Sequence, residues 1–193
     1  MRTAVMVAEL KNFYSGAGAD DNERLATKSN RFLELMSKCV HKYGGDVVQF
    51  LGGNSIIALW LPNLEPREDS TARKALQCAL DLRAEDICIG LGFGHVGLLH
   101  VGGVFNRVEY LVLGDALNQA LAALNLSSKE ESVVISGALA DMVRMHFQLE
   151  TLKKSHLIEA DQFSVIEERA VTGLLGEGVR SKVNTLVQRA KIE

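Results

Sequence analysis

The stretch that decides the fold runs from Gly44 to Trp60 and reads GGDVVQFLGGNSIIALW. It contains two short apolar runs, Val47 to Leu51 and Ser55 to Trp60, joined by a Gly-Gly-Asn tripeptide. Adjacent runs of β-branched and aromatic residues with a Gly-Asn joint predict a tight β-hairpin. We expect this hairpin to bury one face against a core.

The rest of the chain supplies alternating strands and helices around the hairpin. Apolar runs predict further strands at residues 3–10, 86–103, 108–113 and 132–135, with late edge strands at 148–152 and 163–167. Apolar spacing predicts helices from about residue 22 to the Gly44-Gly45 stop and at 70–84. Gly114 and Asp115 lead into a further helix at 116–126, and Ser136 caps one that reaches about residue 146. This order predicts an α+β, ferredoxin-like fold, with a mostly antiparallel sheet and helices on one of its faces.

Length and composition favour one soluble domain followed by a short tail. The chain has 193 residues, 47% of them apolar and 23% charged. We expect the domain to span residues 1–170, and residues 171–193 to form a Gly-containing linker and a C-terminal amphipathic helix. The net charge of −3, without a run of five like charges, argues against nucleic-acid and membrane surfaces as partners.

The cysteines and the absence of targeting signals predict a cytoplasmic protein. Cys39, Cys78 and Cys88 are scattered and form no CxxC pair, so we expect reduced, buried thiols. No signal peptide and no apolar stretch of membrane-spanning length is visible in the sequence.

Three local patterns are candidates for chemistry. Gly92 to Gly97 matches GxGxxG, but the residues after it look extended rather than helical, which disfavours a dinucleotide site. His95 and His100 have no cluster of cysteines or carboxylates nearby, so structural or surface roles are favoured over a metal site. Glu9 ends the first strand, where it is either a metal ligand or, as the spacing alone favours, a solvent-facing carboxylate.

Three blocks together resemble the class III nucleotidyl cyclase catalytic domain, in its soluble adenylyl cyclase-like branch. They are VAELKNF (Val7 to Phe13), the hairpin stretch, and IGLGFGHVG…HVGGVFNRVEYLVLGDALNQA (Ile89 to Ala120). The blocks occur in the order of the family and the resemblance covers Thr3 to Ile166. It implies a ferredoxin-like nucleotide cyclase fold with added elements.

The resemblance also implies a reaction and a site shared by two domains. Such domains pair head to tail and convert a nucleoside triphosphate into a cyclic monophosphate and pyrophosphate. The chemistry requires two metal ions on two aspartates. It also requires a lysine with an aspartate or threonine to read the base, and an asparagine with an arginine to orient the ribose and hold the developing charge.

This sequence departs from the metal pattern at both positions. Glu9 replaces the first aspartate and is longer by a methylene, which displaces the carboxylate by about an ångström. The hairpin turn, where the second aspartate belongs, is Gly52-Gly53-Asn54 and carries no carboxylate.

The positions implied to bind nucleotide are also degenerate. Gln49 stands at the base-reading lysine and Leu111 at its partner. Asn118 is the one transition-state position that is kept, since the expected arginine is Ala122. Arg107 belongs to the turn before the strand at 108–113 and does not replace it.

We therefore predict a catalytically silent cyclase homology domain that acts as a dimerisation, scaffold or regulatory partner of another cyclase-like domain. The partner is a second copy or a different domain, within a larger assembly or alone, and no cofactor is expected. One alternative is a diverged active cyclase, a phosphorus–oxygen lyase that uses Glu9 with Mg²⁺ or Mn²⁺ and ATP or GTP. The other is a module that binds a nucleotide without turnover, through Asn118, the turn amides and the start of the helix after Gly114.

Overall fold

The computed structural model describes residues 1–15, 21–62, 68–83, 86–103, 105, 108–128, 132–151 and 162–168. The strands are β1 (Arg2–Leu10), β2 (Asp46–Leu51), β3 (Ser55–Trp60), β4 (Ile87–His95), β5 (Gly97–Gly102), β6 (Val108–Leu113), β7 (Val133–Ser136), β8 (Phe147–Thr151) and β9 (Gln162–Glu168). The helices are α1 (Asn22–Lys42), α2 (Glu68–Asp81), α3 (Asp115–Leu126) and α4 (Gly137–Val143). The expected linker and tail helix, and Arg107, lie outside the described residues.

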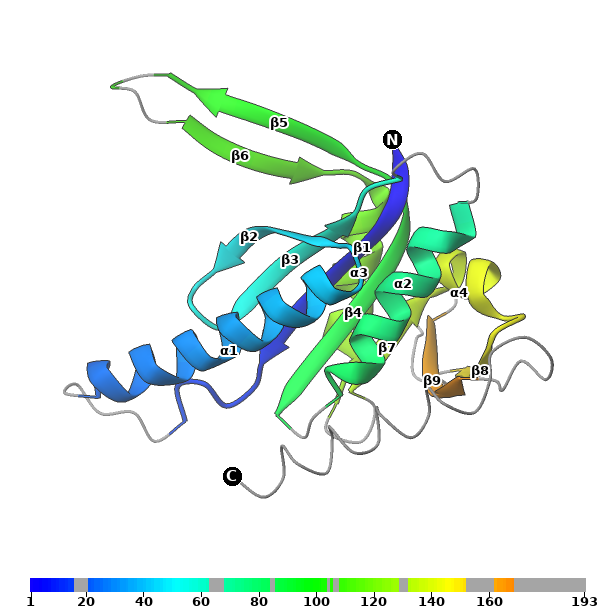
Figure 1. Ribbon diagram of the computed structural model, residues 1–193, viewed down its shortest axis with the longest axis horizontal. Coiled ribbons are helices and arrows are strands. Elements are labelled where there is room, and N and C mark those ends of the chain that lie inside the picture. Colours follow the sequence, from blue (N-terminus) through cyan, green and yellow to red (C-terminus); the bar gives the residue numbers. More distant parts are fainter. Residues whose placement is uncertain are drawn as a thin grey trace.

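A seven-stranded sheet in the order β2-β3-β1-β4-β7-β9-β8 forms the centre of the molecule (Figure 1). The strands of the first β-α-β-β-α-β unit lie in the order β4-β1-β3-β2, which is the ferredoxin-like arrangement. Only the β4–β7 pair is parallel among the described pairings. The predicted α+β fold with a mostly antiparallel sheet is confirmed.

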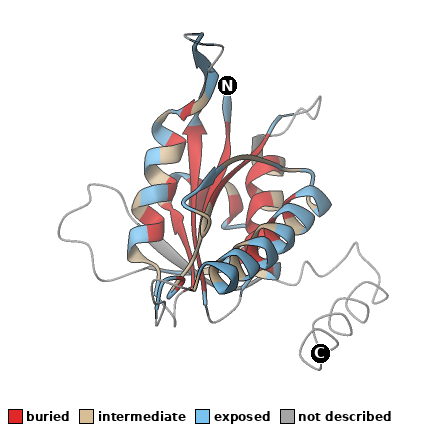
Figure 2. Ribbon diagram, turned by 90° about the vertical axis from the view of Figure 1, so that its left-hand side faces the viewer, coloured by how far each residue is buried: buried red, intermediate tan, exposed pale blue. Residues whose placement is uncertain are grey.

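Strand β1 lies between β3 and β4 and is buried on both sides. Its residues from Thr3 to Ala8 are all buried, and they alternate between two apolar clusters. Met6 belongs to the larger cluster, while Val5 and Val7 belong to the smaller one on the opposite face. Figure 2 shows the buried strands at the centre of the molecule, with the exposed surfaces of the helices outside.

Helices cover both faces of this sheet, so the expectation of helices on a single face is wrong. Buried residues of α1, α2 and α4 pack in the larger cluster, and those of α3 pack in the smaller one. Glycines in β4 allow α3 to lie directly on the strand. A Cβ at Gly90 would overlap the carbonyl oxygen of Ala120, and one at Gly92 would lie 2.8 Å from the amide nitrogen of Ala120.

The same contacts explain the GxGxxG pattern. Gly92 and Gly94 lie inside β4, and Gly97 begins β5, so the run continues as strand and opens no helix. A dinucleotide fingerprint requires a strand-to-helix turn at these glycines. Here Gly92 and Gly94 serve close packing between β4 and α3, whereas Gly97 makes no such contact.

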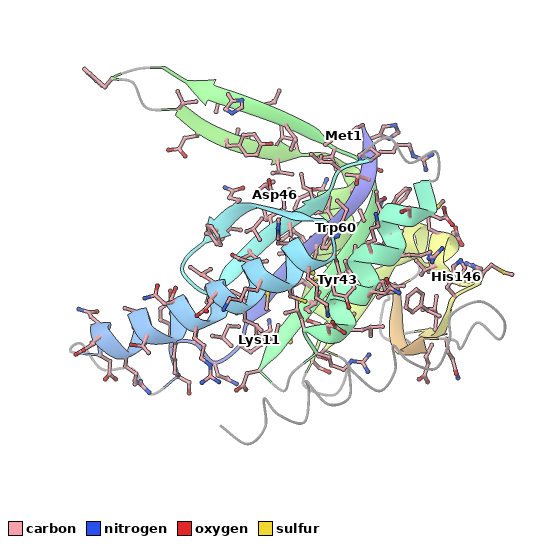
Figure 3. The ribbon with its side chains drawn as sticks, in the orientation of Figure 1. Met1, Lys11, Tyr43, Asp46, Trp60 and His146 are labelled. Atoms are coloured by element: carbon pink, nitrogen blue, oxygen red, sulfur yellow. The ribbon has the colours of Figure 1, made fainter. Side chains whose placement is uncertain are left out.

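The end of α1 is fixed to the hairpin. Gly44 has a φ of +72°, and the Gly45 amide donates to the carbonyl of Val40 at 2.9 Å, which closes the helix with a glycine cap. Trp60 packs over this cap, since a Cβ at Gly45 would lie 2.7 Å from its ring. The indole Nε1 of Trp60 donates to the carbonyl oxygen of Tyr43 at 3.1 Å, and both residues are labelled in Figure 3.

Strands β5 and β6 form a separate two-stranded ribbon that projects from the body (Figure 1). Leu98, Tyr110 and Val112 on one face of its base pack against the smaller apolar cluster. The opposite face carries three large apolar side chains that stay exposed: Leu99 (46%), Val101 (40%) and Leu113 (48%). None of the described helices is long and apolar enough to cross a membrane.

Candidate functional site

Glu9 lies near the end of β1, with Ser55 and Cys88 as its cross-strand neighbours. Side chains alternate along a strand, so Glu9 shares the face of Val5 and Val7, which is the α3 side of the sheet. Its carboxylate is 30% exposed and its Oε2 lies 3.0 Å from the Nζ of Lys11. Lys11 follows β1 directly and is labelled at this end of the strand in Figure 3.

The turn of the β2–β3 hairpin meets the same end of the sheet. Gly52 and Gly53 have φ values of +59° and +80°, which L side chains rarely adopt, so the glycines are required there. The Leu10 amide donates to the carbonyl of Asn54 at 2.8 Å, and the Asn54 Nδ2 donates to the carbonyl of Leu10 at 3.4 Å. The side chain of Asn54 is therefore turned back onto β1.

Two side chains from other elements hold the carbonyls of this turn. Ser29 of α1 donates from Oγ to the carbonyl of Gly53 at 2.6 Å. Tyr14 donates from its hydroxyl to the carbonyl of Gly52 at 3.1 Å. These contacts fix the turn at the end of β1 that carries Glu9, but they bring no second carboxylate there.

The donors at this end do not fit a pair of divalent ions. The Glu9 carboxylate already pairs with a lysine, and the Asn54 amide is the turn's only side chain with an oxygen donor. Within the described part of the chain, no group of three or more His, Cys, Asp and Glu residues has the arrangement of a metal site. Mg²⁺ in nucleotide sites is typically held by one or two carboxylates together with substrate phosphates, and this end offers one carboxylate that is already paired.

Gln49 lies on β2 opposite Ile57, directly after a break in the strand register at Val48. Ile57 belongs to the smaller apolar cluster, so the half-buried Gln49 faces the same side of the sheet as Glu9. A glutamine there offers an amide and no positive charge.

Leu111 belongs to the ribbon and not to the main sheet. Its cross-strand partner is Leu99, on the ribbon face opposite the packed Tyr110 and Val112. Gln49 and Leu111 therefore come from two different sheets, and Leu111 adds to the apolar outer face of the ribbon.

Asn118 is exposed in the first turns of α3. The helix lies along β4, with Ala116 against Gly92 and Ala120 against Gly90. In the sheet register these glycines pair with Val5 and Val7, so Asn118 lies two to four strand residues from Glu9, about 7–13 Å along β1. Among the described contacts, no hydrogen bond joins Asn118 to Glu9.

The start of α3 is braced by residues that the sequence analysis did not single out. The Oδ1 of Asp115 accepts from the His95 amide at 2.7 Å. The Oε1 of Gln119 accepts from the Phe93 amide at 3.3 Å and from the Ser136 hydroxyl at 2.8 Å. The signal for Asp115 was its place after Gly114 at a predicted helix start, where an acidic residue is favourable.

The two histidines are placed apart from any metal-ligand cluster. The Nδ1 of His95 lies 3.9 Å from the Oδ1 of Asp115, and both side chains are mostly exposed. The ring of His100 lies 4.9 Å from that of Tyr110 across the ribbon. The predicted structural or surface role of both residues fits these positions.

Comparison with known proteins identifies the fold. No protein-family model matches the sequence, and no curated protein does either. The guanylate cyclase domain of RhGC from Catenaria anguillulae, solved with GTP, superposes with a TM-score of 0.71 at 20% identity, over 87% of this chain and 97% of that domain. The adenylyl cyclase CyaB from P. aeruginosa superposes with a TM-score of 0.71 at 18% identity, over 90% of this chain and 98% of that one.

A dimeric guanylyl cyclase domain of the RhoGC fusion protein from Blastocladiella emersonii is also similar. Its TM-score is 0.68 at 17% identity, and the match covers 87% of this chain and 95% of that domain. The chain thus has the fold of the catalytic domains of adenylyl and guanylyl cyclases, over nearly their full length. The resemblance in the sequence blocks and the superposition agree on this fold.

Proposed function

We propose that this chain is a cytoplasmic, catalytically silent cyclase-fold domain that pairs with another cyclase-like domain, as its scaffold or regulatory partner. The observation that carries the proposal is the Glu9–Lys11 ion pair at 3.0 Å. Glu9 is the one carboxylate at the implied metal positions, and the positive charge of Lys11 neutralises it. A divalent ion would have to displace that lysine.

The other half of the metal site supports the same conclusion. Asn54 is neutral and its amide nitrogen donates back to Leu10, so the turn offers no charge to a second ion. In two-metal phosphoryl chemistry the ions stabilise both the attacking and the leaving oxygens. Losing one such charge typically costs about 3 kcal/mol, a factor of a hundred or more in rate.

The positions implied to recognise the base and to orient the ribose have also lost most of their functional side chains. Gln49 and Leu111 supply neither the lysine nor the hydrogen-bonding partner that base recognition requires. Asn118 is present and exposed, but Ala122 replaces the arginine that would hold developing charge. The chain is therefore impaired in either role of a two-domain cyclase.

Pairing is supported by the outer face of the ribbon. Leu99, Val101 and Leu113 are each at least 40% exposed on one ribbon face, and neighbouring exposed apolar side chains are typical of interaction sites. A similar domain, that of RhoGC, has been solved as a non-canonical dimer and also as a monomer. We propose that this ribbon face takes part in the contact with the partner domain.

A cyclase assay tests the silent half of the proposal. The purified chain is incubated with ATP or GTP and Mn²⁺ or Mg²⁺, alone and with a second cyclase domain, and cyclic nucleotide is measured. The P. aeruginosa CyaB domain serves as the positive control. We expect the chain alone to give no product above background. Cyclic nucleotide production that is abolished by Glu9→Ala would contradict the proposal and favour the diverged cyclase.

A thermal-shift titration separates the nucleotide-binding alternative. A ligand that binds only the folded state raises its unfolding midpoint. We expect no shift with ATP or GTP, because the cleft lacks the groups that read base and phosphate. A rise that is lost in Asn118→Ala would replace the scaffold with a nucleotide-binding module.

A further inference from the structure

Cys39 on α1 and Cys78 on α2 lie 39 residues apart in the sequence and side by side in the fold. Their sulfur atoms are 3.6 Å apart, with the Cys78 thiol donating to the Cys39 sulfur. The Cys39 Sγ also lies 3.7 Å from the carbonyl oxygen of Cys78. We infer that these two residues form a reversible thiol–disulfide pair, which a peroxide oxidises to a cross-link between α1 and α2.

The packing of the two helices already brings the sulfurs into contact. A disulfide bond is about 2.05 Å long, so the sulfur atoms have to approach by about 1.5 Å. Rotation of the two cysteine side chains is the movement that this bond requires.

Polar contacts one turn further along both helices hold them together. The Nζ of Lys42 lies 2.7 Å from the Oδ2 of Asp81, and the hydroxyl of Tyr43 donates to the same oxygen at 2.6 Å. Lys42 and Tyr43 lie three and four residues after Cys39, and Asp81 lies three residues after Cys78. On a helix this spacing places them on the same side as the cysteines. These contacts between α1 and α2 therefore keep Cys39 and Cys78 opposite each other.

Burial assigns different roles to the two thiols. Cys39 is half-buried and within reach of a small oxidant, whereas Cys78 is buried. The hydrogen bond from Cys78 lowers the pKa of Cys39, an effect that the nearby Lys42 supports against the opposing effects of burial and Asp81. The same hydrogen bond, together with burial, raises the pKa of Cys78. Cys39 is thus the thiolate that reacts first, and Cys78 keeps its proton until the second step.

The reaction balances with hydrogen peroxide as the oxidant. The Cys39 thiolate attacks one peroxide oxygen, the O–O bond breaks, hydroxide leaves, and a sulfenic acid forms on Cys39. The Cys78 sulfur then attacks the Cys39 sulfur, the S–O bond breaks, and water leaves with the proton of Cys78. Two thiols are oxidised and one peroxide is reduced to water.

A structural zinc site is the competing assignment for two adjacent cysteines. Such sites need four protein ligands, and the described residues contain no cluster of three or more metal-ligating side chains. The neighbouring carboxylate of Asp81 already pairs with Lys42 and accepts a hydrogen bond from Tyr43. The disulfide pair therefore fits the contacts and the zinc site does not.

The experiment uses the folded full chain, treated with hydrogen peroxide and then blocked with a thiol alkylating reagent. Non-reducing peptide mass spectrometry should show a Cys39–Cys78 cross-link with the loss of two hydrogen atoms, reversed by dithiothreitol. Cys88 is buried on the other face with its sulfur 3.7 Å from the Ser128 carbonyl, and it should stay a free thiol that is alkylated only once the chain is unfolded in the blocking reagent. The oxidised chain should unfold at a higher temperature than the reduced chain, because the cross-link restricts the unfolded state.

Matched variants make the result specific. Cys88→Ser should form the same cross-link, and Cys39→Ser and Cys78→Ser should form none, with circular dichroism confirming that each variant is folded. The inference is overturned if Cys39 proceeds to sulfinic acid without a cross-link. It is equally overturned if the disulfide involves Cys88 or a second chain, or forms only in denaturant.

Discussion

Gly92 and Gly97 belong to one glycine-rich run but stand in opposite environments. A Cβ at Gly92 would lie 2.8 Å from the Ala120 amide nitrogen and overlap the Ala116 carbonyl oxygen, so α3 would have to move. At Gly97 the nearest atom to a Cβ is 3.9 Å away, which is ordinary contact. We expect Gly92→Ala to lower the free energy of unfolding by about 1–3 kcal/mol, measured by urea denaturation.

Gly97→Ala is the control for this prediction. Replacing an unstrained glycine by alanine reduces the entropy of the unfolded chain, so we expect it to be neutral or slightly stabilising. Equal destabilisation by both substitutions would show that the run is sensitive as a whole. In that case packing against α3 would not be the reason for its glycines.

Single residues were predictable where a position in an element fixes them. The sequence placed Glu9 at the end of a strand and Gly52 to Asn54 in a hairpin turn, since the apolar runs and the Gly-Asn joint determine both. It did not predict the Glu9–Lys11 pair, because the chain leaves β1 after Leu10 and the direction of the Lys11 side chain depends on how it leaves. It also missed Cys39–Cys78, a contact that depends on how two helices pack and leaves no local spacing signal.

Helix α1 supports the hairpin turn through one hydrogen bond, and the helix offers a matched comparison for it. The Ser29 hydroxyl donates to the Gly53 carbonyl at 2.6 Å, whereas Ser37 on the same helix is exposed. Serine to alanine raises helix propensity equally at both positions. We expect Ser29→Ala to be less stable than Ser37→Ala by about 1 kcal/mol, the typical net value of a hydrogen bond, measured by urea denaturation.

Two outcomes decide this comparison. A difference near the expected value, with an unchanged circular dichroism spectrum, assigns the loss to the turn contact. Equal stability of the two variants would mean that Tyr14 and the β1 backbone alone hold the turn, since their bonds to Gly52 and Asn54 remain.

The elements themselves were largely predictable, but their placement was less so. The periodic stripe of α1 and the Gly44-Gly45 cap gave that helix and its end, and the described Phe32, Met36 and Val40 are buried as the stripe requires. The sequence predicted α3 as a helix but not which side of the sheet it covers. The glycines of β4 indicate which side α3 covers, because a helix backbone can lie this close to a strand only where the strand residues have no side chain on that face.

The molecule as a whole is covered unevenly. Three helices, α1, α2 and α4, pack on one face of the sheet, while α3 and the base of the ribbon cover the other. Glu9, Gln49 and Asn118 all belong to this second side, and no hydrogen bond among the described contacts joins Asn118 to Glu9. The sequence resemblance implies a site shared between two domains, and this remains a prediction, because a single chain contains no partner.

Association through the ribbon is the prediction that concerns the whole molecule. Sedimentation velocity over a range of concentrations should show the chain moving from monomer towards dimer. The double variant Leu99→Ser/Val101→Ser should remain monomeric, because it removes apolar area from the exposed ribbon face. The control is Leu35→Ser, which changes an equally exposed leucine (46%) on α1, across the sheet, and should associate like the unaltered chain.

A chain that stays monomeric throughout would contradict pairing with a second copy. Equal association of all three proteins would place the contact away from the ribbon, and the scaffold role would then need another surface.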